Sequence, residues 1–138
     1  MLSEADIATY REAIDLYNKF NPVACTNCRY CECPYGIQIP EVFAWWNSFQ
    51  GEGRVPADEG PNDSQELRRE FLVCYYNAIP EHARADRCTG CKKCKEGCPQ
   101  WVFRIDTEME KIAEVVAHVR EVFLSRGGRL HGKGVLPC

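Results

Sequence analysis

Apolar residues recur every three or four positions near the start of the chain, which is the spacing of an amphipathic helix. Ser3 and Asp6 form a weak capping box ahead of them, so we predict a helix that begins at Ser3 and ends near Asn18. Its apolar stripe consists of Ile7, Tyr10, Ile14 and Tyr17. Such a stripe is more often core packing than a cofactor site, and we expect it to be buried.

Two more helices follow. Pro40 suits the first turn of the second one, because its missing N–H would have no partner there. Asp63 and Glu66 form a capping-box candidate for a third helix, which should end before Ile79-Pro80. The apolar residues of these two helices, also expected in the core, are Val42, Phe43, Trp45, Trp46, Leu67, Phe71, Cys74, Tyr75 and Ala78.

Thr107 and Glu110 predict the start of a fourth helix, and Gly127-Gly128 predicts its end. No stretch alternates convincingly between apolar and polar residues, although a short strand is expected near Ile37-Gln38-Ile39. The fold class is therefore predicted to be mainly α, with one domain over residues 1–126 and a tail over 127–138. The stripe of the fourth helix consists of Met109, Ile112, Val116, Val119 and Phe123.

Composition narrows the classes of function. The formal charge of −3, from 17 basic and 20 acidic residues, disfavours a nucleic-acid or anionic-membrane partner. No run approaches the roughly 18 apolar residues that span a bilayer, and the acidic N-terminus does not resemble a signal peptide. We therefore expect a cytoplasmic protein. The ten cysteines, at short spacings in a reducing compartment, are expected to hold metal rather than to form a disulfide framework.

The strongest motif is the second cysteine group, which contains Cys88, Cys91, Cys94 and Cys98, followed by Pro99. This C-x2-C-x2-C-x3-C-P run is typical of bacterial ferredoxins. Gly90 and Gly97 permit backbone angles closed to other residues, or a close approach to the cluster. Structural zinc is the rival interpretation, but zinc sites usually take two separated cysteine pairs.

A first group repeats this order with Cys25, Cys28, Cys31 and Cys33, followed by Pro34. Two such groups ordinarily hold two clusters, each with three cysteines from one group and the fourth from the other. One [4Fe–4S] cluster is thus predicted on Cys25, Cys28, Cys31 and Cys98, and the other on Cys88, Cys91, Cys94 and Cys33.

The single residue between Cys31 and Cys33 is a departure, because the second group has three residues at that step. A three-iron cluster at this position is an open alternative. Cys74 is expected to be a buried thiol rather than a substitute ligand, and no role is expected for Cys138. Basic residues beside the cysteines are expected either to raise the reduction potential and dock a redox partner, or to be solvated surface charges: Arg29, Lys92, Lys93 and Lys95.

From Cys25-Thr26-Asn27-Cys28-Arg29-Tyr30-Cys31 through Cys33-Pro34 to Gly36-Ile37-Gln38-Ile39-Pro40, the sequence resembles the C-terminal iron–sulfur region of ferredoxin-linked aldo/keto reductases. Cys98-Pro99-Gln100 and the order of helices fit as well, so the resemblance covers about Leu2 to Phe123. It departs at the Cys31-Glu32-Cys33 step and at Val102-Phe103-Arg104-Ile105, where a second Ile-x-Ile-Pro-like element is expected.

The resemblance implies an electron-transfer domain that works with a nicotinamide-binding barrel, either in the same chain or as a partner. None of that barrel is in this sequence, so no catalytic residue is assigned, and the chain is not expected to be catalytic alone. Two alternatives are an independent ferredoxin-like carrier that serves several redox partners and a structural zinc module.

Overall fold

The computed structural model describes residues 1–98 and 105–130, and within these ranges the chain is helical without a strand. The mainly α class is therefore confirmed. No helix in the described ranges is long and apolar enough to cross a membrane. The helices are α1 (Glu4–Phe20), α2 (Ile39–Gly51), α3 (Gln65–Ala78), the short η1 (Glu81–Ala83) and η2 (Ala85–Arg87), α4 (Lys93–Gly97) and α5 (Ile105–Ser125).

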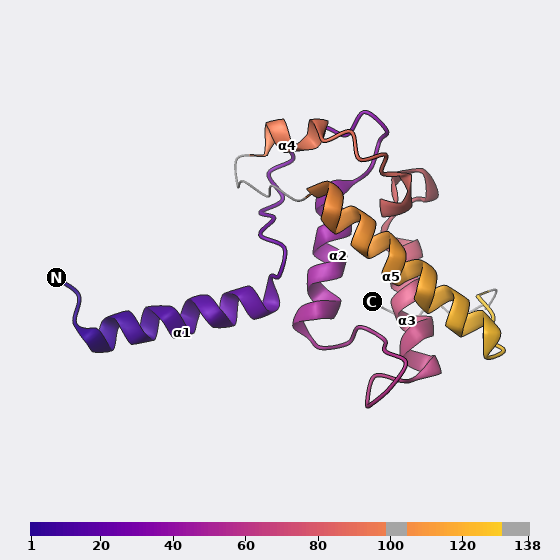
Figure 1. Cartoon of the computed structure of the whole chain (residues 1–138), viewed down its shortest axis with the longest axis horizontal. Coiled ribbons are helices and arrows are strands. Elements are labelled where there is room, and N and C mark those ends of the chain that lie inside the picture. Colours follow the sequence, from indigo (N-terminus) through magenta and orange to yellow (C-terminus); the bar gives the residue numbers. More distant parts are fainter. Residues whose placement is uncertain (99–104, 131–138) are drawn as a thin grey trace.

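The core lies where α2, α3 and α5 pack together (Figure 1). Trp45 of α2 stacks against Phe71 and Tyr75 of α3 with ring centroids 4.7 and 4.4 Å apart, and Phe49 meets Phe71 edge-on at 5.1 Å. The predicted burial of Trp45 and Tyr75 is thus confirmed. The predicted stripe of α5 is also fully buried, from Met109 to Phe123.

The first helix forms as predicted but does not join this core. The Ser3 hydroxyl accepts a hydrogen bond from the Asp6 N–H, and the Asp6 carboxylate accepts one from the Ser3 N–H, which completes the capping box. However, α1 extends away from the other helices (Figure 1) and has no buried residue. The predicted burial of Tyr10 and Tyr17 is wrong: they are 58% and 56% exposed, because only the C-terminal end of α1 meets α2.

Three local predictions need correction. The cap of α3 is Ser64 rather than Asp63, since the Ser64 hydroxyl accepts from the Leu67 N–H. Thr107 does not start a helix, because α5 already includes Ile105. The strand near residues 37–39 is absent: Ile39 begins α2, and the Gln38 N–H donates to the Ala83 carbonyl of η1 instead of to a strand.

The end of α5 follows its glycines. Gly127 has a φ of +81°, a left-handed conformation that favours glycine. Its N–H donates to the Leu124 carbonyl, and the Gly128 N–H donates to the Phe123 carbonyl. The predicted stop is confirmed; the tail beyond Leu130 lies outside the described residues.

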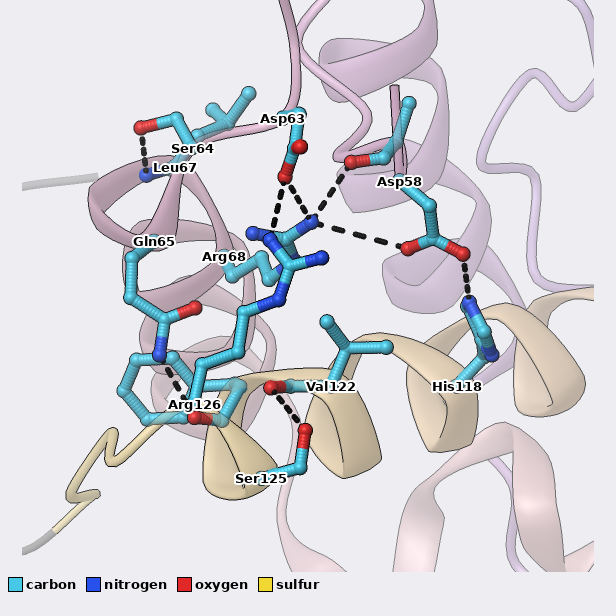
Figure 2. Close-up of polar contacts among 12 residues, drawn as sticks. Asp58, Asp63, Ser64, Gln65, Leu67, Arg68, His118, Val122, Ser125 and Arg126 are labelled. Carbon is cyan, nitrogen blue, oxygen red and sulfur yellow. Dashed lines mark hydrogen bonds and ion pairs between the residues drawn. The ribbon is translucent and has the colours of Figure 1, made fainter.

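A polar network fixes the loop between α2 and α3 to α5 (Figure 2). The Arg68 side chain, 1% exposed, donates to Asp63 at 2.6 Å and to the Ala57 carbonyl at 2.8 Å. Arg126 of α5 donates to the same Asp63 oxygen at 2.8 Å, and His118 of α5 meets Asp58 at 2.6 Å. Hydrogen bonds from Arg68 and Arg126 hold the pKa of Asp63 below its ordinary value.

Candidate metal centres

Both cysteine groups lie at the end of the molecule where α2 and α5 begin, beside α4 (Figure 1). Buried Asn47 of α2 fixes the approach to the first group, since its side chain exchanges two hydrogen bonds, of 2.8 and 3.0 Å, with the backbone of Val23. Tyr75 fixes the approach to the second group by accepting a hydrogen bond from the Ala85 N–H. Burial raises the pKa of Tyr75 to about 12, so this hydroxyl keeps its proton at neutral pH.

The backbones of the two groups repeat each other. Asn27 and Arg29, two and four residues after the first cysteine, have φ values of 60° and 65°. The same two positions of the second group, Gly90 and Lys92, have φ values of 75° and 65°. Turns with left-handed residues make successive N–H groups converge, which forms anion-binding concavities of the kind found at iron–sulfur sites. The repeat seen in the sequence therefore extends to the backbone.

Four cysteines line a first hollow of about 320 Å³: Cys25, Cys28 and Cys31 from the first group, and Cys98 from the second. Cys28 is exposed and the other three are partly buried. The rest of the lining is mainly apolar and includes Ile39, Pro40, Phe43 and Ile105. We call this set of four cysteines the first centre.

A second hollow of about 320 Å³ is lined by Cys88, Cys91 and Cys94 from the second group and Cys33 from the first. Cys94 is buried, with 8% of its surface exposed, and Cys91 is exposed. The lining also includes Ile37, Ile39, Ile105 and Met109. We call these four cysteines the second centre. The two centres are neighbours, because Ile39 and Ile105 line both hollows.

The structure thus brings the eight predicted cysteines together in the two crossed sets of four that the sequence predicts. All eight are free cysteines. Cys31 and Cys33 face different hollows despite the single residue between them. Cys74 is buried on α3, lines neither hollow and does not have a free thiol, so the expectation of a free thiol there is wrong. Pro99, Gln100, Val102 to Arg104 and Cys138 lie outside the described residues.

Gly97 allows the two groups to come together. A Cβ atom at this position would lie 2.2 Å from the Tyr30 carbonyl oxygen, so only glycine fits against the first group without movement of the backbone. Gly90 has open space around it and is needed for its positive φ. The two glycines that the motif singles out therefore have different purposes.

The thiols repel negative charge in the absence of metal. Burial, followed by repulsion from Cys33 and Cys88, raises the pKa of Cys94 to about 11. Burial is also the main cause that raises the pKa of Cys25 and Cys31, and the proximity of Cys98 adds to both. Because metal ligands must be deprotonated, a bound cationic group has to supply the compensating charge.

An ion pair connects each group to the first turn of a neighbouring helix. Arg29, between two cysteines of the first group, pairs with Glu41 of α2. Lys95, beside Cys94, pairs with Asp106 of α5 at 2.6 Å, which lowers the pKa of Asp106. Sequence reasoning missed both acidic partners, although acidic residues in a first helical turn are a recognisable pattern. Lys92 and Lys93 are exposed.

Comparisons with known proteins leave the family open. No family model matches the chain, and no solved structure matches it. A stretch of 45 residues is 40% identical to the DNA-directed RNA polymerase subunit Rpo3 of Archaeoglobus fulgidus. This stretch covers 33% of the chain and 17% of that subunit, so the similarity is local.

Proposed function

We propose that the chain binds two [4Fe–4S] clusters and transfers electrons. The observation that carries this proposal is the pair of neighbouring hollows, each lined by four free cysteines from both groups. Cys25, Cys28, Cys31 and Cys98 would hold one cluster, and Cys88, Cys91, Cys94 and Cys33 the other. Bound there, the clusters supply one-electron chemistry.

The donor set fits such a group. Thiolates are soft ligands that favour iron–sulfur clusters and zinc, and four of them complete a cubane. A single zinc ion requires its sulfurs about 2.3 Å from one point. Within residues 1–98 and 105–130, no His, Cys, Asp or Glu cluster is arranged to hold a single metal ion. Both hollows therefore favour a larger group whose ligands are spread over several metal ions.

The protein's own residues create the path and its ends. Ile39 and Ile105 form the shared wall, which excludes water between the centres with a single layer of side chains. One cysteine of each centre, Cys28 or Cys91, is exposed, so each centre has an edge open to a redox partner. Electrons would enter at one edge and leave at the other.

The sequence resemblance supports a role as the C-terminal domain of an aldo/keto reductase-like oxidoreductase in the cytoplasm, with the nicotinamide-binding barrel as its partner. An independent ferredoxin-like carrier is the second candidate, favoured by the two exposed edges. The gene sequence upstream separates the candidates, because it either encodes a barrel in frame or does not. In either case the isolated chain should be reduced by dithionite, yet should not turn over aldehydes or ketones with NADPH.

Anaerobic metal and sulfide analysis, combined with electron paramagnetic resonance, tests the proposal. We expect about eight iron and eight sulfide per chain. About seven iron, with the signal of an oxidised three-iron cluster, would identify the shortened Cys31-Glu32-Cys33 step as the site of an incomplete cluster. Stoichiometric zinc without sulfide would overturn the proposal and support the structural zinc module.

A further inference from the structure

Opposite ends of the two ion pairs face the two hollows. At the first centre the cation Arg29 lines the hollow, and its partner Glu41 does not. At the second centre the anion Asp106 lines the hollow, and its partner Lys95 does not. Lys92 also lines the second hollow, so its charged lining is one cation and one anion, against a single cation at the first.

Burial differs in the same sense. The second centre includes Cys94, which is 8% exposed, whereas no described cysteine of the first centre is fully buried. The Asp106 side chain is 15% exposed, and the Arg29 side chain is 60% exposed. Solvent therefore screens the charge of Asp106 less than that of Arg29.

We propose that Asp106 and Arg29 set the two reduction potentials apart, so that the second centre is the more strongly reducing one; this inference rests on the proposed function. Reduction adds a negative charge to the cluster. A facing carboxylate and a buried, low-dielectric position both oppose that charge, while a facing guanidinium favours it. Lys92 is exposed and only partly offsets Asp106.

The consequence is a direction. When one electron is present, it resides on the first centre, held by Cys25, Cys28, Cys31 and Cys98. Electrons delivered at the Cys91 edge would pass downhill to the Cys28 edge. Glu41 and Lys95 are positioning residues, because each acts through the partner that faces the hollow.

The test is a reductive titration of the reconstituted full chain, followed by electron paramagnetic resonance. Cys28→Ala and Cys91→Ala, which each remove one exposed ligand, assign the signals to the first and second centres. Asp106→Asn should raise the potential of the second centre selectively. Glu108→Gln is the matched control, since Glu108 lies on the same helix and lines neither hollow.

A second variant tests the inference if Asp106→Asn fails to fold. Arg29→Gln should lower the potential of the first centre, by less than Asp106→Asn raises that of the second, because Arg29 is more exposed. Lys19→Gln, on exposed α1, removes the same charge far from both hollows and should change neither potential.

The outcomes separate this inference from the proposed function. Two clusters with the second centre at the lower potential, and selective shifts in the variants, would support it. Equal or reversed potentials, or variants that shift neither centre, would overturn it while leaving the proposed function intact. Absence of clusters from the wild-type chain would refute both.

Discussion

The first and second cysteine groups have the same backbone but different surroundings. Both place left-handed residues at the same two positions, and both contribute their last cysteine to the other group's hollow. The first hollow is faced by a cation, whereas the second contains a buried cysteine and is faced by an anion. The repeat thus defines which atoms bind, while the neighbouring helices α2 and α5 set the electrostatic environment of each centre.

Loss of a crossing cysteine should have the largest effect. Cys98→Ala is expected to remove mainly the cluster of the first centre, and Cys33→Ala that of the second, each with loss of about four of eight irons. Iron analysis and paramagnetic resonance of both variants measure this. Glu32→Ala, at the exposed residue between Cys31 and Cys33, should keep both clusters. Loss confined to the mutated residue's own group would reject the crossover.

The junction of the groups should be the next most sensitive feature. Gly97→Ala is expected to destabilise the protein by about 2–3 kcal/mol, because the new methyl group meets the backbone oxygen of Tyr30. Thermal unfolding of the loaded protein measures the change. Gly53→Ala is the control: it also has a positive φ, but open space surrounds it, so it should cost only about 1 kcal/mol. Equal effects would mean that close approach is unimportant.

The shared backbone can be tested by exchanging residues between the groups. Gly90→Ala should cost about 1–2 kcal/mol, because φ is +75° there and L-residues are strained in this region. Gly90→Asn should cost less, since Asn27 occupies the same position of the first group at +60°. Equilibrium unfolding compares the two variants. If asparagine were as costly as alanine at Gly90, the groups would not be equivalent.

The smallest effect is expected at the polar network far from both centres. The pKa of Asp63 is lowered by Arg68 and Arg126, so the stabilisation is complete above the ordinary value near 3.8 and is lost as pH falls through the lowered pKa. The difference in stability between wild type and Asp63→Asn should be constant from about pH 7 to 5 and should shrink below about pH 4. Thermal unfolding across this range measures it.

A matched comparison removes the contribution of acid-induced cluster loss, because both proteins carry the same two centres. Glu59→Gln, on the same exposed loop, should show no such change in difference with pH. A constant difference down to pH 3 would contradict a role for ionised Asp63.

Local signals in the sequence determined the helices and the choice of cysteines. The capping box at Ser3, the stripe from Met109 to Phe123 and the stop at Gly127 depend on neighbours a few residues away, so each is readable from the chain itself. Spacing and repetition likewise identified the two crossed sets of four cysteines, which the structure gathers around two hollows.

Tertiary structure decided what each stripe and charge faces. The stripe of α1 has the same period as that of α5, yet Tyr10 and Tyr17 are exposed, because periodicity defines a face without supplying the surface that covers it. Glu41 and Asp106 both lie in first helical turns, and only the packing of α2 and α5 against the cysteine groups makes Arg29 face one hollow and Asp106 the other. Electrostatic environment depends on distances between residues remote in sequence, and those distances come from the fold.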